Sequence, residues 1–414
     1  CYNVAEVNHM FCSGVIAEYN PFHNGHMHHL RETINIAGNP NVIAVMSGSF
    51  VQRGEPALFD KFTRTRMALK CGVSLVIELP CVFSLSSAEG FASGAVRLLN
   101  GSGMVKDLCF GSETPDLRAM ESLANIEGKQ QYDLDYEIRA NLKKGQAYPR
   151  AFYEAAERLG IVREGVDVLS KPNSLLGVEY LRAIRAHAPM IKAHAIKRLA
   201  CAHDEAELKD YISSASSIRE EIGAGRLKNA VKRVPDVISD DLIDAALAAD
   251  MQRSSEILFR LLVYRLLSSE NEKIARVADV GEGLENVLAL SALSSSSYSE
   301  FLSMCKSKRY SLARIRRICM NALIGITREV KAAAMNGKTP LYLRVLGVRK
   351  DAMHVLSALS NQASIPVITR YRDADKLPSA SQLLIKLDTM ATSIRSLIFG
   401  GSAVREFSFP LIVV

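Results

Sequence analysis

The sequence predicts an α/β fold, in which an open, parallel, Rossmann-like sheet is followed by a mostly helical carboxyl-terminal region. Two observations carry this prediction. Short unbroken runs rich in Val, Ile and Leu alternate with helical segments through the first 110 residues, as strands buried on both faces of a parallel sheet do. After about residue 220, helix-like periodicity dominates. We therefore expect two domains, over 10–225 and 226–414, which suits the length of 414 residues.

The strands and helices of the first part follow one another regularly. We expect strands at Cys12–Ala17, Asn41–Met46, Val73–Leu79 and Met104–Phe110. We expect helices between them at Gly25–Ala37, Asp60–Cys71 and Ser84–Asn100. Asp60 is suited to cap the second helix, and Gly72 follows its last turn. Such alternation implies right-handed crossovers in an open α/β sheet.

Helical patterns make up most of the remaining chain. Residues 115–220 are mostly helical, apart from the loop Leu169–Ser174 and a short apolar run at Met190–Ile196. Later helical patterns cover Asp241–Ala248, Ser254–Leu267 and Ala313–Met335. Further strands are expected at Tyr342–Leu346, Ile365–Ile368 and Phe409–Val414.

Composition excludes several classes of protein. Hydrophobic residues make up 48% of the chain and charged residues 23%, with a net charge of +7, which is ordinary for a globular enzyme and unlike a disordered chain. The best candidate for a membrane span, Val73–Leu99, holds three charged residues, so no span is predicted. The eight cysteines include no C-x-x-C pair. We therefore expect reduced, mostly buried thiols and a cytoplasmic location.

The segment Gly14–Leu30, GVIAEYNPFHNGHMHHL, carries the most chemical information. A buried strand runs into a polar loop and then into a helix, whose first N–H groups and partial positive charge favour phosphate. Gly25 removes a Cβ where phosphate must approach the backbone. His23 and His26 are three residues apart, so both can project to one side and donate to phosphate oxygens. We predict that both are catalytic and stabilise charge as pyrophosphate leaves.

The same histidines allow an interpretation as a metal site. The H-x-x-H spacing suits zinc, and His28 and His29 follow directly. Because no neighbouring cysteine or carboxylate completes a ligand set, we predict no metal site. His28 and His29 are then helix residues without a chemical role of their own.

These residues resemble a known signature. H-x-G-H after the first strand is the signature of the class I nucleotidyltransferase-like fold, and the longer E-Y-N-P-F-H-N-G-H resembles the bacterial tRNA(Met) cytidine acetate ligases. Other stretches that resemble this family are Val45–Ala57, Val76–Pro80, Cys109–Glu113 and Lys171–Gly177. The resemblance implies that ATP activates acetate as acetyl-adenylate. It also implies that the acetyl group passes to N4 of the wobble cytidine of elongator tRNA(Met).

The resemblance further implies an ATP site, with Mg²⁺ accompanying the triphosphate. The residues of its loop are Ile16, Ala17, Glu18, Tyr19, Asn20, Pro21, Phe22, His23, Asn24, Gly25, His26, Met27, His28 and His29. Gly111, Asn173 and Arg198 match the family's remaining nucleotide contacts. Plainer interpretations exist, since Gly111 could end a strand and Arg198 could be a surface base.

A second phosphate element is predicted at residues 212–219, ISSASSIR. It resembles the I-S-S-T-x-x-R segment of nucleotidyltransferases, although it lacks the threonine. Ser213, Ser214 and the N–H groups of a helix start could bind the β- and γ-phosphates, with Arg219 neutralising charge. The alternative is an ordinary serine-capped helix. In the loop Ser47–Ala57, candidate contacts to the acyl group or the tRNA are Gln52, Arg53 and Glu55.

A basic segment favours an RNA partner. Residues 306–317, KSKRYSLARIRR, hold six basic residues and one tyrosine. If a helix begins at Ser311, Arg314 and Arg317 share a face that suits a phosphate backbone, and Tyr310 could stack on an unpaired base. The alternative is a solvated amphipathic helix. The predicted RNA-binding residues are Lys308, Arg309, Arg314 and Arg317.

Two other functions stay open at the level of the sequence. A nucleotidyltransferase that adenylylates or cytidylylates a small phosphorylated acceptor would share the H-x-G-H loop, but it would not need a basic helical region. A non-catalytic RNA-binding protein would not need an intact pair of His23 and His26. The ligase interpretation uses both features, with ATP, acetate and tRNA as its substrates.

Overall fold

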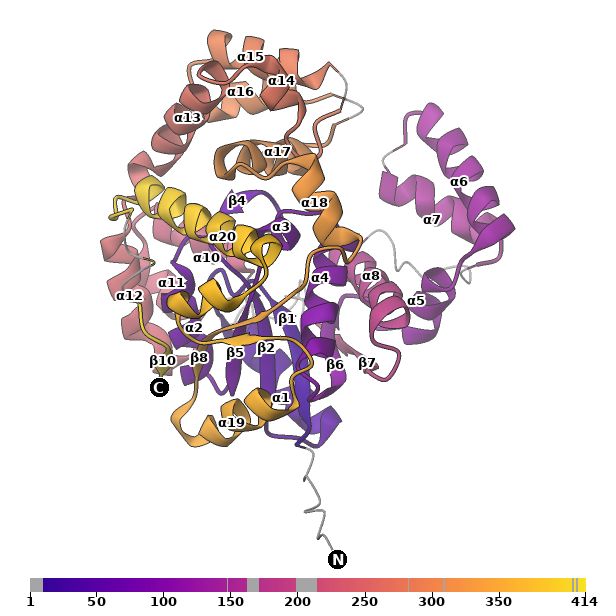
Figure 1. Ribbon diagram of the computed structural model, residues 1–414. Coiled ribbons are helices and arrows are strands. Elements are labelled where there is room, and N and C mark those ends of the chain that lie inside the picture. Colours follow the sequence, from indigo (N-terminus) through magenta and orange to yellow (C-terminus); the bar gives the residue numbers. More distant parts are fainter. Residues whose placement is uncertain are drawn as a thin grey trace, which may run out of the picture.

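The predicted fold class is correct. The computed structural model describes residues 10–146, 148–161, 171–198, 214–281, 283–307, 310–403, 406 and 409–414 (Figure 1). Within these residues, helices pack around one mostly parallel sheet, and the chain after about residue 214 is mainly helical.

The sheet is built from strands of both halves of the chain. Its strands are β1 (Cys12–Ala17), β2 (Val42–Ser47), β5 (Leu75–Leu79), β6 (Val105–Ser112), β7 (Lys192–Lys197), β8 (Leu343–Val348), β9 (Val367–Ile368) and β10 (Ile412–Val413). Their order is β10-β8-β5-β2-β1-β6-β7, and β9 lies beside β8. Every described pairing in this sheet is parallel except β5 with β8. The four strands predicted in the first 110 residues are confirmed with small differences at their ends, whereas the strands predicted at Ile365–Ile368 and Phe409–Val414 are shorter, β9 and β10 having two residues each.

The order of strands reverses between β1 and β6. From β1 the chain passes outward to β2 and β5, and it then crosses back to β6 and continues to β7. In an open α/β sheet, ligands bind outside the carboxyl ends of the strands at such a switch point. The carboxyl ends of β1 and β6 are therefore the expected place for a nucleotide.

Helices cover both faces of the sheet. Because the crossovers are right-handed and change direction at the switch point, α1 (Asn24–Ala37) and α2 (Lys61–Lys70) cover one face, whereas α4 (Ala88–Gly101) and α8 (Pro172–His187) cover the other. The helices α4 and α8 pack closely against each other. The short hairpin of β3 (Phe50–Val51) and β4 (Glu55–Pro56) projects from the carboxyl end of β2.

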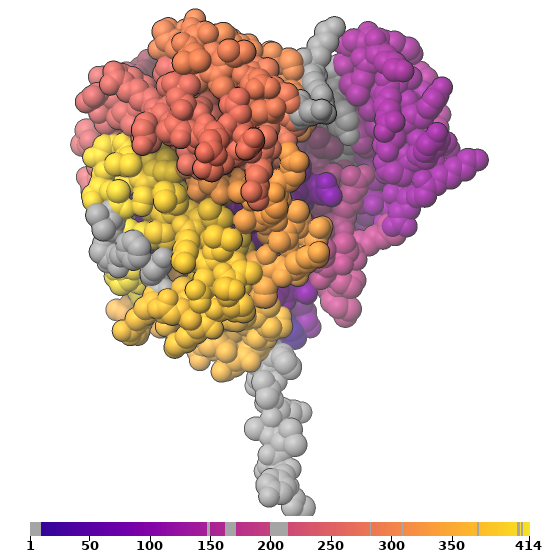
Figure 2. Space-filling model, turned by 45° about the horizontal axis from the view of Figure 1, so that its top comes forward, coloured from indigo at the N-terminus to yellow at the C-terminus, as the bar shows by residue number. Residues whose placement is uncertain are grey.

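The other helices surround this core. Their bounds are α3 (Cys81–Ser84), α5 (Leu117–Ala124), α6 (Gly128–Lys143), α7 (Tyr148–Arg158), α10 (Ala215–Gly223), α11 (Leu227–Val231), α12 (Ser239–Ala248), α13 (Met251–Leu267), α14 (Asn271–Ala275), α15 (Leu284–Ser294), α16 (Tyr298–Cys305), α17 (Leu312–Ile324), α18 (Arg328–Met335), α19 (Met353–Gln362) and α20 (Ser379–Ile398), with 3₁₀ turns at Asp236–Ile238, Lys350–Ala352 and Tyr371–Lys376. Figure 2 shows α6 and α7 as a lobe to one side of the main body. Among the described residues, no helix combines the length and hydropathy that a membrane span needs.

The helical pattern predicted over Ala313–Met335 is in fact two helices. Gly325 ends α17 with a left-handed φ of 89°, a conformation in which glycine carries no Cβ penalty. The Thr327 side chain then caps α18 by accepting from the Val330 N–H. Apolar periodicity runs through this break, because both helices pack on the same core, and so the pattern did not reveal it.

A buried ionic cluster joins the carboxyl-terminal strands to the first part of the chain. Lys61 Nζ lies 2.6 Å from a Glu78 oxygen and 2.9 Å from a Glu406 oxygen. Arg344, on β8, pairs with both of these carboxylates. All four side chains are buried. Because β8, β9 and β10 belong to the same sheet as β1, residues beyond 340 contribute to the core of the amino-terminal part of the chain. The division into domains at 10–225 and 226–414 stays a prediction.

Candidate active site

The loop after β1 lies at the switch point. Ile16, Ala17 and Glu18 are partly exposed where the strand ends. Tyr19 has a left-handed φ of 45°, and the Asn20–Pro21 peptide bond is cis. The loop is fixed to the segment before α2, because the buried Asn20 side chain accepts from the Leu58 N–H at 2.8 Å. The chain then enters α1 with its first turn directed at this edge of the sheet.

The imidazole rings of His23 and His26 lie side by side at the start of α1, tilted by 30° to each other. His23 is the N-cap, and its Nδ1 accepts from the Gly25 N–H at 3.1 Å. His26 Nδ1 accepts from the His23 N–H at 3.3 Å, and the two ring centroids are 3.7 Å apart. A nitrogen that accepts a hydrogen bond carries no proton, so each neutral ring holds its proton on Nε2.

Both imidazoles are neutral at physiological pH. Burial lowers the pKa of His23 to about 3, with a further contribution from the charge of Arg198. Burial also lowers the pKa of His26 well below its usual value, helped by His23 and Arg198. The pair therefore presents two N–H donors that need no proton from solution. This fits the predicted role of donating to phosphate oxygens.

Gly111 and Arg198 meet at the carboxyl ends of β6 and β7. A Cβ on Gly111 would lie 3.2 Å from Arg198 Cγ, so the arginine side chain passes directly over the glycine. The Arg198 N–H donates to the Ser112 carbonyl at 2.8 Å. The exposed guanidinium lies close enough to His23, His26 and His29 to lower the pKa of all three. The structure thus brings these predicted residues together.

Asn173 is tied to the carboxyl end of β6 by the carboxylate of Glu113, a residue that the sequence did not single out. The Asn173 side-chain amide donates to Glu113, whose other oxygen accepts from the Ser174 N–H at 3.1 Å. Ser112 and Ser174 share a hydrogen bond of 2.9 Å. Glu113 therefore anchors the start of α8 to the end of β6. Its sequence signal was its place directly after a buried strand.

The second predicted phosphate element packs on the first. Ser214 caps α10 by accepting from the Ser217 N–H at 3.2 Å. Arg219 donates to the Asn20 carbonyl at 2.9 Å and to Ser216 Oγ at 3.2 Å. Ser213 lies outside the described residues. The serine cap and the guanidinium thus lie beside the β1 loop, although their sequence distance from it is about 200 residues.

The β3–β4 hairpin connects β1 to the basic helix. The Gln52 N–H donates to the Glu18 carboxylate at 2.8 Å. Glu55 pairs with Arg316 of α17 and lies 3.9 Å from Arg219. These contacts engage two of the three loop residues that the sequence analysis proposed for the acyl group or the tRNA.

The helix expected from Ser311 is present as α17, and its Arg314 and Arg317 side chains donate to neighbouring backbone carbonyls. Ser311 caps the helix, and Ile315, Ile318 and Cys319 are buried. Arg314 donates to the Asp279 carbonyl at 3.1 Å, and its guanidinium lies 4.6 Å from the centre of the Tyr310 ring. Arg317 donates to the Gln52 carbonyl at 3.4 Å. Lys308 and Arg309 lie outside the described residues.

Tyr310 differs from its predicted role. Its side chain is 6% exposed and covered by Arg314, so its ring is not open to a base in this structure. A position beside a basic run favours stacking on RNA when only the sequence is considered. Packing of the loop before α17 decides otherwise.

The comparisons with known proteins agree with this geometry. The family described as HIGH Nucleotidyl Transferase matches residues 10–407. The tRNA(Met) cytidine acetate ligase of Alkaliphilus metalliredigens is 35% identical over 401 residues, which cover 94% of this chain and 95% of the relative. The tRNA(Met) cytidine acetate ligase of Geobacillus sp. is 38% identical over 362 residues, which cover 86% and 88%.

Solved structures are similar over the whole chain. The crystal structure of Thermotoga maritima TmcAL bound with alpha-thio ATP matches with a TM-score of 0.86 at 32% identity, covering 98% of this chain and all of that chain. The apo crystal structure of the same Thermotoga maritima protein matches with a TM-score of 0.87 at 32% identity. The fold and its arrangement are therefore shared with a protein that binds an ATP analogue.

Proposed function

This chain belongs to the tRNA(Met) cytidine acetate ligase family within the HIGH nucleotidyl transferases, and on that premise we propose that it uses ATP and acetate to acetylate N4 of the wobble cytidine of elongator tRNA(Met). The observation that carries the proposal is the convergence at the switch point. There, the neutral imidazoles of His23 and His26, the guanidinium of Arg198 and the bare backbone of Gly111 face one edge of the sheet.

The first half-reaction is the formation of acetyl-adenylate. ATP lies across the carboxyl ends of β1 and β6, with its phosphates over the start of α1. An acetate oxygen attacks the α-phosphorus in line, and the bond to pyrophosphate breaks. The Nε2–H groups of His23 and His26 and the guanidinium of Arg198 stabilise the charge that develops. Arg219, which donates to the Asn20 carbonyl, neutralises the leaving pyrophosphate.

In the second half-reaction, the cytidine N4 attacks the acetyl carbon, the carbon–oxygen bond to AMP breaks, and the amine loses a proton. The chemistry needs no protein nucleophile, because positioning and charge stabilisation suffice. The thiols agree with this. Cys12 and Cys71 are buried, and burial raises the pKa of each to about 12. Neither therefore provides a thiolate at neutral pH.

The protein would bind Mg²⁺ together with the nucleotide. Among the described residues, no group of three His, Cys, Asp or Glu side chains is arranged to hold a metal ion. Phosphate oxygens and water are the usual ligands of Mg²⁺ in such sites. We propose that the triphosphate carries the ion, which would shield its charge.

The cysteines support a cytoplasmic location. The described cysteines at positions 12, 71, 81, 109, 305 and 319 are all free and buried. Thiols kept reduced in the core are typical of a reducing compartment, where disulfides rarely persist. We therefore propose that the protein acts in the cytoplasm, where its proposed tRNA substrate is found.

The dependence of ATP–pyrophosphate exchange on acetate tests the proposed reaction. We expect exchange with acetate and only background exchange without it, because pyrophosphate can return only to an adenylate that acetate has formed. Mass analysis of the nucleosides should then show acetylated cytidine after incubation with ATP, acetate and tRNA. Exchange that is indifferent to acetate would instead favour the nucleotidyltransferase alternative.

The double substitution Arg314→Ala with Arg317→Ala tests the RNA-binding surface. We expect weaker tRNA binding and a shallower dependence of log Kd on log salt, with the slope reduced by about 1–2, since each phosphate that the protein neutralises adds about one unit to the slope. Filter binding at several salt concentrations measures both. Lys106→Ala with Lys192→Ala is the matched control, because these exposed lysines lie at the amino ends of β6 and β7, away from the carboxyl ends where the nucleotide is expected. An equal slope in both variants would count against α17.

A further inference from the structure

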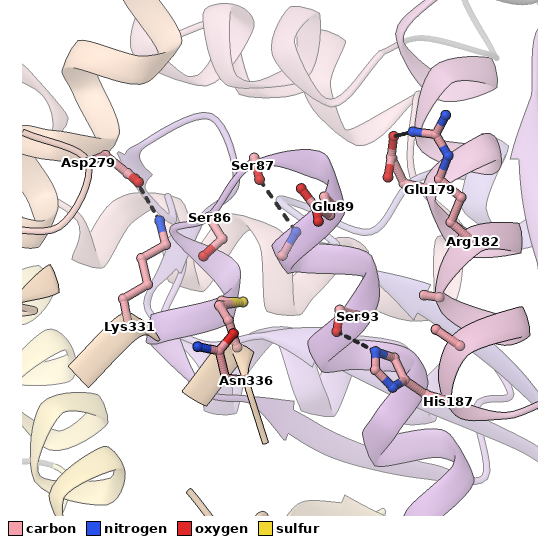
Figure 3. Close-up of a pocket in the computed structure, with 14 residues that line it drawn as sticks. Ser86, Ser87, Glu89, Ser93, Glu179, Arg182, His187, Asp279, Lys331 and Asn336 are labelled. Atoms are coloured by element: carbon pink, nitrogen blue, oxygen red, sulfur yellow. Dashed lines mark hydrogen bonds and ion pairs between the residues drawn. The ribbon is translucent and has the colours of Figure 1, made fainter. Parts of the chain in front are cut away.

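A recess lies between α4, α8 and α18, beside the proposed active site (Figure 3). Its volume is about 490 Å³, which is within the usual range for sites that bind small organic groups. The carbonyl of Ser86, a lining residue, accepts from the Gln52 side chain at 3.5 Å, and the Gln52 N–H donates to Glu18. The recess therefore begins near the carboxyl end of β1. No motif in the sequence predicts it.

Two ion pairs line this recess. On α8, Arg182 Nη1 lies 2.8 Å from Glu179 Oε1, and Arg182 is also fixed to the Leu123 carbonyl at 3.1 Å. On α18, Lys331 Nζ lies 2.6 Å from Asp279 Oδ2. Figure 3 shows the two pairs on opposite sides. Each pair sets a carboxylate acceptor beside a cationic donor.

The charges in the lining argue against a phosphate ligand. With Glu89 included, the carboxylates outnumber the Arg182 and Lys331 cations, and His187, whose pKa is lowered by burial and by Arg97, adds no positive charge. A polyanion would meet net negative charge here. An uncharged ligand with donors and acceptors along one edge would instead match the paired side chains.

The surroundings indicate where such a ligand comes from. Arg314 donates to the Asp279 carbonyl, so the predicted RNA-binding face of α17 adjoins the recess. The charges of Arg314 and Arg317 also act on Lys331. A polar recess beside a cationic helix suits RNA whose backbone lies on the helix while one unstacked base turns inward.

We infer that this recess binds an unpaired, amino-bearing nucleobase of the RNA substrate, cytosine or adenine, with Glu179 accepting from the exocyclic amine and Arg182 donating to the adjacent ring nitrogen. Cytosine and adenine each place an amino donor next to an acceptor nitrogen, whereas uracil presents an N–H at that position. The inference rests on the proposed function, because it takes RNA as the acceptor. It names a base contact that the phosphate-binding surface does not supply.

Binding of short labelled RNA oligonucleotides tests the inference directly. We expect the wild-type protein to bind an oligo(C) about tenfold more tightly than an oligo(U) of equal length, the scale of one good carboxylate or guanidinium contact to a base edge. Glu179→Gln should reduce this preference, because the amide no longer distinguishes a donor from an acceptor and only Arg182 still disfavours the ring N–H of uracil. Ala186→Trp, at an exposed position in the lining, should fill the recess and weaken oligo(C) to the level of oligo(U).

Matched controls separate the recess from general effects. Glu256→Gln removes the same charge from a Glu–Arg pair on α13, and Leu290→Trp adds the same ring at an exposed position of α15; both should keep the preference. Arg314→Ala with Arg317→Ala should weaken both oligonucleotides equally. Equal binding of oligo(C) and oligo(U) by the wild type, or an undiminished preference in Glu179→Gln and Ala186→Trp, overturns the inference.

The experiment also separates this inference from the proposed reaction. Acetate-dependent exchange needs no RNA, so Glu179→Gln should exchange like the wild type while acetylating tRNA about tenfold more slowly at low tRNA concentration. If the wild type shows no acetate-dependent exchange, the proposed function fails. The preference for oligo(C) over oligo(U) still tests whether the recess binds a base. Normal acetylation of tRNA by Glu179→Gln would contradict base binding in the recess and would leave the proposed function unaffected.

Discussion

His26→Ala and His23→Ala are each expected to slow acetate-dependent ATP–pyrophosphate exchange by about 10²–10³-fold while leaving tRNA binding intact, the usual scale for removing one donor that stabilises developing charge. Each ring holds its proton on Nε2 because its Nδ1 accepts a backbone N–H. Alanine therefore removes a donor that is already oriented. Steady-state exchange and filter binding of tRNA measure the two effects separately.

Arg31→Ala is the matched control for the histidine variants. Arg31 lies on the same helix, is exposed, and carries a full positive charge. If general positive charge near α1 were enough for catalysis, Arg31→Ala would impair exchange more than the histidine variants do, because both imidazoles are neutral. We expect it to exchange at close to the wild-type rate. Near-normal exchange in both histidine variants would refute their assigned role.

Lys61→Met is expected to lower the free energy of unfolding by about 3–5 kcal/mol, because it leaves the two buried carboxylates of Glu78 and Glu406 with a single cation, Arg344. Lys61 is the ammonium between Glu78 and Glu406, and it is fully buried. Arg344 contacts the same two carboxylates, but its single positive charge balances only one of them. Equilibrium unfolding in urea, followed by circular dichroism, measures the loss.

Lys70→Met provides the comparison for this stability prediction. Lys70 pairs with Asp241 at 2.6 Å, but the lysine side chain is 32% exposed. Exposed pairs contribute at most about 1 kcal/mol, since water screens them in both states. A loss in Lys61→Met no larger than the loss in Lys70→Met would show that the cluster does not join the carboxyl-terminal strands to the sheet.

Much of the fold could be predicted from local patterns. The strands from Cys12 to Phe110 were recognisable because strands buried on both faces must be apolar without interruption. The cap at Asp60 was also recognisable and is confirmed, since its side chain accepts from the Thr63 N–H at 2.8 Å. The antiparallel pairing of β8 with β5 was not predictable. Nothing in a strand's composition states which neighbour it will have when the partner is more than 250 residues away.

Some residues of the candidate site could also be predicted from local patterns, whereas others could not. His23, His26 and Gly25 could be singled out because the phosphate chemistry and the strand-to-helix turn lie within one short segment. Glu113, which holds Asn173, and the contact of Arg219 with the Asn20 carbonyl depend on how distant segments pack. The same is true of Tyr310, whose sequence setting favours an exposed ring and whose packing buries it.

The sequence by itself determined that a phosphate-binding turn follows a buried strand, because a helix N-terminus, a glycine and two histidines act over a few residues. Tertiary structure decided how that turn is completed. It set Arg198 over Gly111, placed Arg219 on the β1 loop and formed the recess between α4, α8 and α18. These features arise from contacts across long stretches of chain. Their energies depend on the packing of the whole sheet and not on any local pattern.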